Sequence, residues 1–431
     1  MRLTLLLTPL LTPLLACKPI SVAAPGDDSV VSADDSAPDS AHGGDSVEHV
    51  GGSDSAGEDS PEPEGWPRAC DEIYDADTLP TFELTFSDES WSGIQRACNS
   101  GSQAYFPITF TYDGESAAAM ARLKGNWSWS CDKLQFTISF NEEDPDGRFR
   151  GLRKIVLDAP WYDHTLLHER LAFALFRDRG LPYSCANNAR VEINGEYYGL
   201  YANVERLDHE YLERNFEEPD GNLYQAGSEL KTNLDVADTS RLEALQAART
   251  VDEIDALMDL DQAVAEWSME AMIPAMDNYW AGVEINYYLY DHPTQGFIYL
   301  PYDMDIAFGD AAYSDGSLIW PDAVESDPIL YEHSGWRKER LFQTVLADPT
   351  WCARFVEELV ISRAAYDPDA LAAQVAAWDA QIDQSLRDDP NKTFTNSRHR
   401  QAIASLSAFF QQRADVVDAW LAEGGHCPAR W

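Results

Sequence analysis

The chain carries the run LPYDMDIAFG at residues 300–309, directly after two segments with the pattern of a β-hairpin, 285–290 and 296–300. Asp303 and Asp305 stand two residues apart, and side chains at i and i+2 lie on the same face of an extended strand. Two carboxylates held on one face repel each other unless a proton or a cation lies between them. Mg²⁺ or Mn²⁺, which prefer oxygen ligands, would be natural occupants. An acidic turn at a strand end is the alternative explanation of an isolated Asp-x-Asp pair.

The predicted hairpin lies within a half of the chain whose other patterns are helical. From about residue 239 onward, apolar residues recur with helical spacing in five segments, 242–248, 261–276, 351–364, 370–386 and 399–421. Residues 82–224 show mainly strand patterns, interrupted by one helix predicted over 163–179. Hairpin turns are predicted in this half at Asp113-Gly114 and Asn194-Gly195.

This distribution predicts an α+β fold with two lobes. We expect a strand-rich N-lobe with one key helix over about 67–225, and a mainly helical C-lobe with the embedded hairpin over about 226–431. Clefts between such lobes are common ligand sites.

The first 66 residues are expected to stand apart from this fold. An apolar run over residues 3–16 follows Met1-Arg2, and it is too short for a membrane span but typical of a secretory signal. Its ending, LLAC, is typical of a bacterial lipobox. We therefore predict a lipoprotein signal peptide over 1–16 and a lipid anchor at Cys17, with an ordinary signal peptide before a chance cysteine as the alternative. Residues 17–66 are rich in Ser, Asp and Gly and predict a disordered acidic tether.

The net charge and the cysteines indicate which binding partners are disfavoured and where the protein is located. The formal net charge of −43 argues against nucleic-acid binding. Seven cysteines include Cys17, and the remaining even number predicts disulfides in an exported chain. No two of them form a Cys-x-x-Cys pair, which argues against structural zinc. We expect a protein of the bacterial cell envelope, lipid-anchored and outside the cytoplasm.

A first candidate binding segment is RLKGNWSWS at residues 122–130, with Lys133 just beyond it. A strand that opens into a Gly/Asn/Ser turn with cations nearby can present backbone N–H groups and positive charge to phosphates. The residues predicted to contact a nucleotide are Lys124, Gly125, Asn126, Ser128 and Lys133. The spacing matches neither common phosphate-loop motif, and a tight polar hairpin is the alternative.

Three further residues complete a candidate catalytic set. Asp277 follows a predicted helix, where an aspartate can orient or deprotonate a hydroxyl. Asn286 can supply a neutral oxygen ligand to a metal, and Glu169 on the predicted helix can pair with a lysine. With the Asp303/Asp305 pair and a lysine of the strand-rich half, these residues form a set suited to phosphoryl transfer. Helix capping by Asn278 is the alternative explanation of the segment after Asp277.

His164 and His168 are four residues apart and so lie on one face of the predicted helix. The order is not His-Glu-x-x-His and no third ligand is evident, so we do not predict a zinc site. Asp163 is predicted to cap the helix instead.

Five segments keep an order and spacing that extend from about residue 82 to 310. They are RLKGNWS at 122–128, LHERLA at 167–172, VEINGEYYGLY at 191–201 with Val204-Glu205, NYYLY at 286–290 and PYDMD at 301–305. In these segments the chain resembles the CotH-like (spore coat protein H) family of atypical, secreted or surface-attached kinases. It departs from the family pattern at Tyr302, His168 and Gln225, where relatives often have Trp, Arg and Lys.

The resemblance implies a protein-kinase-like fold that transfers phosphate from ATP, with Mg²⁺ or Mn²⁺, to protein hydroxyls. It implies that Lys133 contacts the ATP phosphates and pairs with Glu169, with Lys124 as the alternative lysine. Asp277 would be the catalytic-loop acid. Asp303 and Asp305 would form the metal-binding end of the site.

Two functions of different classes follow. The first is a surface-anchored atypical kinase that phosphorylates Ser or Thr of an exported or surface protein, or of its own tether. The second is a catalytically inactive kinase-fold module for surface binding or assembly, with Trp127, Trp129 and Trp161 as contact residues. A metal-dependent hydrolase that uses the Asp pair lacks a suitable set of histidines.

Overall fold

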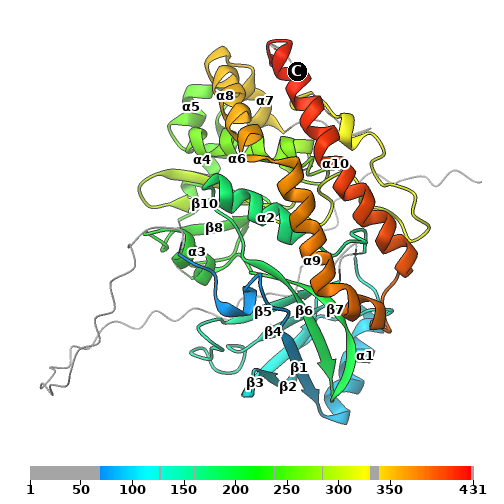
Figure 1. Ribbon diagram of the computed structural model, residues 1–431. Helices are drawn as coiled ribbons and strands as arrows, with labels where there is room; N and C mark the ends of the chain where they lie inside the picture. Colours follow the sequence, from blue (N-terminus) through cyan, green and yellow to red (C-terminus); the bar gives the residue numbers. More distant parts are fainter. Residues whose placement is uncertain are drawn as a thin grey trace, which may run out of the picture. The chain divides into compact units, whose positions relative to one another are not determined.

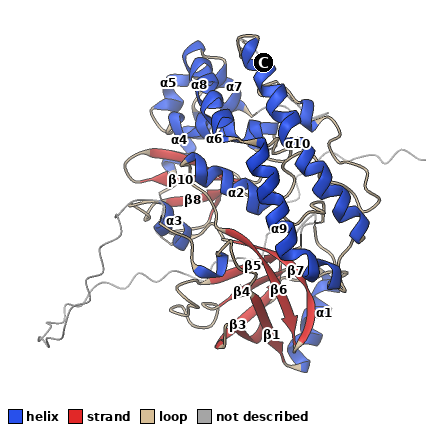
Figure 2. Ribbon diagram, in the orientation of Figure 1, coloured by secondary structure: helices blue, strands red, loops and turns tan. Residues whose placement is uncertain are grey.

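The computed structural model describes residues 68–125, 128–159, 161–235, 238–283, 285–330 and 339–428. The predicted signal peptide, Cys17 and the predicted tether lie outside the described residues, as do Asn126 and Trp127. The described chain contains both helices and strands, so the predicted α+β class is confirmed (Figures 1 and 2). Within these ranges, no helix is long and apolar enough to cross a membrane.

Seven strands of the N-terminal half form a closed barrel in the order β1-β2-β3-β4-β5-β7-β6. They are β1 (Thr81–Phe86), β2 (Phe106–Tyr112), β3 (Glu115–Leu123), β4 (Phe136–Ser139), β5 (Lys154–Asp158), β6 (Ala186–Ile193) and β7 (Glu196–Val204). Neighbouring strands are antiparallel except β1 and β6, which are parallel. The alternation in β1, where Phe82, Leu84 and Phe86 are buried, places one face of the strand in the core.

Both predicted hairpin turns are confirmed. Asp113-Gly114 joins β2 to β3, and Asn194-Gly195 joins β6 to β7. All four residues have positive φ, between 50° and 81°, as tight hairpin turns of this kind require.

The N-terminal half holds more helix than the sequence predicted. Besides α2 (His168–Arg179) it contains α1 (Asp88–Ser100) and α3 (His209–Asn215), whose N-caps are Ser87 and Asp208. The start predicted for α2 at residue 163 is wrong by five residues. The carboxylate of Asp163 accepts hydrogen bonds from the backbone N–H groups of Thr165 and His168, at 2.7 and 2.9 Å, and so holds a turn ahead of the helix.

The C-terminal half combines a small sheet with the remaining helices. The sheet has the order β11-β10-β8-β9, with β8 (Asn222–Gln225), β9 (Glu229–Leu230), β10 (Tyr287–His292) and β11 (Gly296–Pro301). The hairpin predicted ahead of Asp303 is therefore confirmed as β10 and β11. The helices are α4 (Ser240–Ala247), α5 (Val251–Asp255), α6 (Leu260–Met272), α7 (Arg340–Leu346), α8 (Pro349–Ala365), α9 (Pro368–Asp388) and α10 (Asn396–Ala422). The described residues also form short 3₁₀ helices, η2 (Tyr279–Ala281) and η3 (Ala323–Glu325) in this half and η1 (Glu72–Tyr74) ahead of the barrel.

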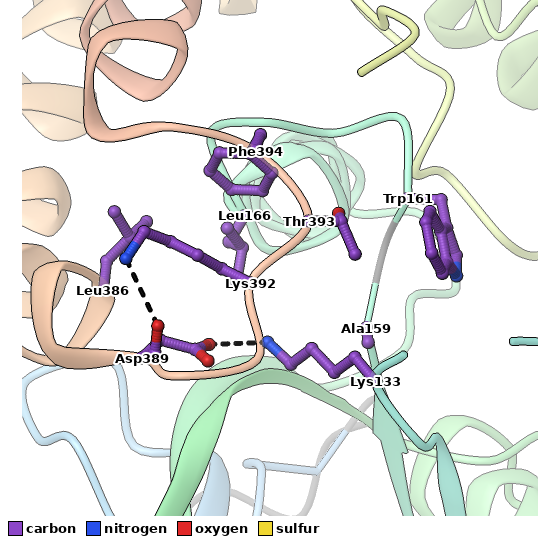
Figure 3. Close-up of a pocket in the computed structure, with 9 residues that line it drawn as sticks. All are labelled: Lys133, Ala159, Trp161, Leu166, Leu386, Asp389, Lys392, Thr393 and Phe394. Carbon is purple, nitrogen blue, oxygen red and sulfur yellow. Dashed lines mark hydrogen bonds and ion pairs between the residues drawn. The ribbon is translucent and has the colours of Figure 1, made fainter. Parts of the chain in front are cut away.

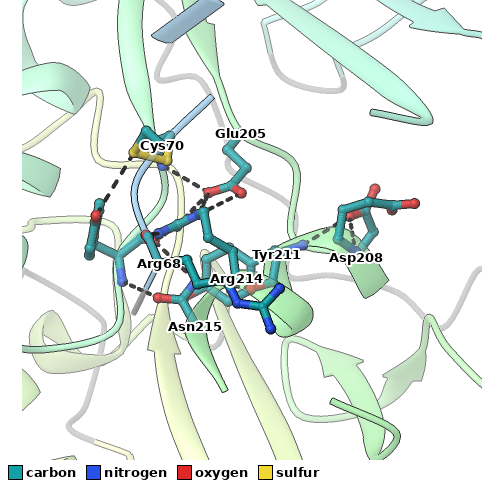
Figure 4. Close-up of polar contacts among 10 residues, drawn as sticks. Arg68, Cys70, Glu205, Asp208, Tyr211, Arg214 and Asn215 are labelled. Atoms are coloured by element: carbon teal, nitrogen blue, oxygen red, sulfur yellow. Dashed lines mark hydrogen bonds and ion pairs between the residues drawn. A yellow bond between two sulfur atoms is a disulfide. The ribbon is translucent and has the colours of Figure 1, made fainter. Parts of the chain in front are cut away.

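The predicted disulfides are present, as Cys70–Cys185, Cys98–Cys131 and Cys352–Cys427. Beside the first of them, the guanidinium of Arg214 on α3 binds the carboxylate of Glu205, with a shortest distance of 2.6 Å (Figure 4). Glu205 also accepts a hydrogen bond from the backbone N–H of Cys185 at 2.9 Å. Glu205, four residues after the VEINGEYYGLY segment at 191–201, therefore joins the barrel to α3 and to the first disulfide.

Helix α9 packs against the barrel at β6 and β7 (Figure 1). Arg190 Nη1 donates to Ser385 Oγ at 2.8 Å, and Tyr197 Oη donates to the Ser385 carbonyl at 2.8 Å. The last residues of α9 and the segment after it are thereby fixed to the strand-rich half.

Glu266 on α6 makes folding stability depend on pH. Its side chain is fully buried, and burial followed by the nearby Glu270 charge raises its pKa well above the ordinary 4.5. Because the folded pKa exceeds the unfolded one, the folded state keeps the Glu266 proton at pH values where the unfolded state has already lost it. Its contribution to stability is complete below about pH 4.5 and is lost as the pH rises.

Glu266→Gln, whose amide has no such proton to lose, should therefore unfold at a higher temperature than the parent at pH 8, by about 2–4 °C. The difference should vanish near pH 4.5. Thermal unfolding followed by circular dichroism would measure it, with Glu243→Gln on the exposed face of α4 as the control. An equal shift at both pH values would show that the Glu266 carboxyl is not protonated in the fold.

Candidate active site

Five carboxyl groups from four separate segments meet beside the barrel. They are Asp158 at the end of β5, Glu169 in the first turn of α2, Asp277 after α6, and Asp303 and Asp305 after β11. The charge of Asp305 interacts with the charges of Asp303, Asp277, Glu169 and Asp158. The structure therefore brings Glu169, Asp277, Asp303 and Asp305 together and adds Asp158, which the sequence did not indicate.

Lys124 is the lysine that enters this acid cluster. It follows the last residue of β3, and its ammonium donates to an oxygen of Asp158. Burial alone would lower the pKa of Lys124, but the carboxylates of Asp158, Asp303 and Glu169 raise it. The ammonium is thus held charged among the acids.

The acids carry more negative charge than Lys124 can balance. Burial and then the charge of Asp158 raise the pKa of Asp303 to about 6, although Lys124 opposes the shift. Burial and the charge of Asp303 raise the pKa values of Glu169, Asp277 and Asp305 well above their ordinary values. An added cation would relieve this repulsion.

Asn278 and Asn286 fix the two acidic segments to each other. The Asn278 amide donates to the carbonyls of Asn286 and Tyr302, at 2.7 and 2.9 Å. The Asn286 amide in turn donates to Asp277 Oδ2 at 2.8 Å. Asn278 therefore bridges the loops, and the alternative that it caps the preceding helix is wrong, because α6 ends at Met272 with Ile273 as its C-cap.

Two residues of these loops adopt a backbone conformation that L-residues seldom use. Asn286 has φ of 55° and Asp303 has φ of 56°, both in the left-handed region. Asn and Asp accept this region more readily than other L-residues, as Asp113 and Asn194 do at the hairpin turns. Asp277 Oδ1 and Glu169 Oε2, both buried, have no hydrogen-bond partner in the described part of the chain. Buried oxygens without a partner are a feature of ligand and ion sites.

The turn after Lys124 is closely packed. Gly125 has φ of 110°, and a Cβ there would lie 3.2 Å from Ser128 Oγ. Gln135 Nε2 donates to the Ser128 carbonyl at 2.9 Å, while Gln135 Oε1 accepts from the Ala159 N–H at 3.3 Å. The turn is thus tied to the residue after Asp158. Asn126, also predicted to contact a nucleotide, lies outside the described residues.

The Cys98–Cys131 disulfide joins the same loop to α1. Trp129, which was proposed above as a surface contact, donates its indole N–H to the Cys98 carbonyl at 3.0 Å. Trp129 therefore helps to anchor this loop.

The predicted pairing of Lys133 with Glu169 is wrong. The Lys133 side chain is buried, and its ammonium donates to Asp389 Oδ2 at 2.7 Å (Figure 3). It also donates to the Leu200 carbonyl at 2.6 Å. A pocket forms at this place between the barrel and the α9–α10 connection, lined by Lys133, Ala159, Trp161, Leu166, Leu386, Asp389, Lys392, Thr393 and Phe394. Lys124 and Lys133 lie at the two ends of one loop. Lys124 binds Asp158, whereas Lys133 binds Asp389.

Asp389 explains why residue 199, within the VEINGEYYGLY segment, is a glycine. A Cβ on Gly199 would lie 2.9 Å from both carboxylate oxygens of Asp389. The same carboxylate accepts a hydrogen bond from the Leu200 N–H at 3.0 Å. Glycine is needed here because the carboxylate of Asp389 packs directly against the strand.

His164 lies ahead of α2, so the prediction that it shares a helix face with His168 is wrong, and the two rings face different partners. The His164 ring packs against Phe394, with 4.6 Å between ring centroids. His168 Nδ1 lies 2.7 Å from the Asp305 carbonyl, and Nε2 lies 2.7 Å from Asp310 Oδ1. Burial alone would lower the pKa of His168, but the charges of Asp163 and Asp310 raise it to about 9.

Asp389→Asn tests the structural role of Lys133. It would leave the buried Lys133 charge unpaired, so we expect a loss of about 3–5 kcal/mol in the free energy of unfolding. The double variant Lys133→Met/Asp389→Leu should recover most of that loss. Urea denaturation would measure both.

The control for Asp389→Asn is Asp418→Asn, which breaks the more exposed Arg363–Asp418 pair and should cost about 0–1 kcal/mol. If Asp389→Asn costs no more than this control, Lys133 does not depend on Asp389.

Comparison with known proteins identifies relatives of the chain. The family model described as CotH kinase protein matches residues 121–417, which is more than half of the chain. "Inner spore coat protein H" of Bacillus subtilis (strain 168) is 34% identical over 80 residues, which are 19% of this chain and 21% of that protein. The match thus spans about a fifth of the relative.

Two solved structures are also similar. The Helicobacter pylori proinflammatory kinase CtkA has a TM-score of 0.34 at 10% identity, covering 67% of this chain and 94% of CtkA. The HipA, HipB and operator DNA complex of Shewanella oneidensis MR-1 has a TM-score of 0.31 at 13% identity, covering 70% of this chain and 68% of the matched chain. Both TM-scores are below 0.5, and the family match alone assigns the chain to a family.

Proposed function

The chain belongs to the CotH kinase protein family, and from this premise we propose that it transfers a phosphoryl group from ATP to Ser or Thr hydroxyls of a protein, with Mg²⁺ or Mn²⁺. The observation that supports this most is the acid cluster around Lys124. Phosphoryl transfer depends on positioning and on charge stabilisation, which a lysine, metal-binding carboxylates and a free carboxylate can supply.

We assign the phosphate-binding role to Lys124 in place of Lys133. Its ammonium already lies among the acids, whereas that of Lys133 is bound to Asp389. Glu169 and Asp158 would hold Lys124 in place. The Gly125 turn and Ser128 lie beside it and can approach phosphate oxygens with backbone N–H groups.

A divalent cation fits the acid cluster. Asp303 and Asp305 would hold it, with Asn286 as a neutral neighbour, and it would neutralise charge on the phosphates. In the described residues, no group of three or more His, Cys, Asp or Glu side chains is arranged so that it could hold a metal ion. Mg²⁺ in nucleotide sites commonly uses one or two carboxylates and completes its shell with phosphates and water, so we expect metal and nucleotide to bind together.

Asp277 is proposed to orient the acceptor hydroxyl and to take up its proton. The Asn286 amide donates a hydrogen bond to Oδ2 of Asp277, while the buried Oδ1 of Asp277 has no partner in the described part of the chain. As the hydroxyl oxygen forms its bond to the γ-phosphorus, the bond from that phosphorus to the β,γ-bridging oxygen breaks and ADP leaves. The hydroxyl proton moves to Asp277.

The proposed setting is the bacterial cell envelope, with a lipid anchor at Cys17 and a substrate that is an exported or surface protein. The three disulfides support a place outside the cytoplasm. Residues 18–66 are a second proposed acceptor, because Asp-Ser pairs recur there at 28–29, 35–36, 39–40, 45–46, 54–55 and 59–60. Since ATP is scarce outside the cytoplasm, transfer would occur before or during export, or with locally released ATP.

Transfer of label from γ-labelled ATP to a generic acceptor protein and to the chain itself would test the activity. We expect Mn²⁺-dependent incorporation, reduced about 10²–10⁴-fold in Asp277→Asn because the proton acceptor is lost. Lys124→Met should weaken ATP binding, whereas Lys133→Met/Asp389→Leu should retain transfer. Folded protein that neither binds ATP nor transfers phosphate would contradict the kinase proposal and favour a surface-binding module.

Metal binding can be followed by thermal unfolding without any turnover. Mn²⁺ with a non-hydrolysable ATP analogue should raise the melting temperature of the parent, because a ligand that binds only the folded state stabilises it. Asp303→Asn should remove that rise. In EDTA at pH 7 the same variant should melt above the parent, because burial and Asp158 make the Asp303 charge unfavourable. A rise that persists in Asp303→Asn would place the metal elsewhere.

A further inference from the structure

His168 connects the helix that carries Glu169 to the turn that carries Asp303 and Asp305. It is the first residue of α2, and its side chain is 1% exposed. One ring nitrogen, Nδ1, lies 2.7 Å from the Asp305 carbonyl. A carbonyl can only accept, so Nδ1 carries the hydrogen.

The other ring nitrogen reaches the far end of the same turn. His168 Nε2 forms an ion pair with Asp310 Oδ1 at 2.7 Å. The ring also packs near Phe308, with 5.5 Å between centroids, and the Phe308 N–H donates to the Ile273 carbonyl at 2.7 Å. One imidazole therefore joins Asp305 to Asp310 from inside the turn.

The helix side of this connection is fixed as well. The backbone N–H of His168 donates to Asp163 Oδ2 at 2.9 Å, so the residue cannot shift along the helix axis without breaking that bond. Glu169 is the next residue and lies in the acid cluster. A displacement of the His168 ring would thus alter the placement of Glu169 relative to Asp303 and Asp305.

We propose that His168 is a positioning residue that holds the turn 303–310 in the conformation that binds the metal–nucleotide complex. The inference rests on the proposed function in so far as it needs that complex to bind, but it does not need transfer to occur. Partners that orient metal ligands without touching the metal typically change metal affinity by about 10–100-fold when removed.

His399 provides a matched control in the same chain. Its ring is also buried between a backbone carbonyl and a carboxylate, with Nδ1 2.8 Å from the His164 carbonyl and Nε2 2.6 Å from Asp379 Oδ1. It lies on α10, and neither of these partners belongs to the turn 303–310. Replacing either histidine removes the same kind of contacts from the core.

The experiment measures the dissociation constant of Mn²⁺ in the presence of a non-hydrolysable ATP analogue, from the electron paramagnetic resonance signal of free Mn²⁺. The full chain is compared with His168→Phe and His399→Phe, which keep a planar ring but remove both N–H groups. We expect binding about 10–100-fold weaker in His168→Phe and within about twofold of the parent in His399→Phe. His168→Arg, which restores two donors, should recover part of the affinity.

Several results would overturn the inference in distinguishable ways. If the parent binds and His168→Phe binds as tightly, His168 does not position the site, and the proposed function is unaffected. If both Phe variants weaken binding equally, the loss is a general effect of core damage. If the folded parent does not bind the metal–analogue complex, the proposed function fails and the inference fails with it. Should His168→Phe not fold, His168→Gln keeps donors for one partner only, and unchanged affinity in that variant would equally refute the role.

Discussion

Electrostatic repulsion among five carboxyl groups, opposed by the ammonium of Lys124, is the constraint on which the proposed site depends. Burial and the neighbouring charges raise the pKa values of Glu169, Asp277, Asp303 and Asp305, so holding these acids together is unfavourable. Loops under such repulsion separate unless other contacts hold them. The amide of Asn278 and the ring of His168 supply those contacts, and both bind backbone carbonyls of the acidic loops.

The same constraint links the fold to the proposed chemistry. Lys124 and Asp158 lie at the ends of two barrel strands, and Glu169 lies on α2. The other three acids, Asp277, Asp303 and Asp305, belong to the helical half. Asp389 then fixes the α9–α10 connection to the barrel through Lys133 and the glycine at 199. Two lysines that the sequence offered as candidates for the site thus have different roles. Lys124 lies in the acid cluster, whereas Lys133 holds the two halves together through Asp389.

Local patterns predicted much of this arrangement. The β10–β11 hairpin and the turn at Asn194-Gly195 follow from alternation and from residues that accept positive φ, so both could be predicted. The choice between Lys124 and Lys133 could not, because the partner of Lys133 lies 256 residues away in the sequence. Asp158 was missed because a single acid at a strand end has no motif, and α2 starts late because the carboxylate of Asp163 holds a turn before it.

Crystals of the protein with Mn²⁺ and a non-hydrolysable ATP analogue would test the central claim most directly, because anomalous scattering locates the metal independently of activity. We predict a manganese peak beside Asp303 and Asp305, with analogue phosphates next to Lys124. A peak absent from those carboxylates, or phosphates bound instead at Lys133 and Lys392 in the pocket of Figure 3, would contradict the account.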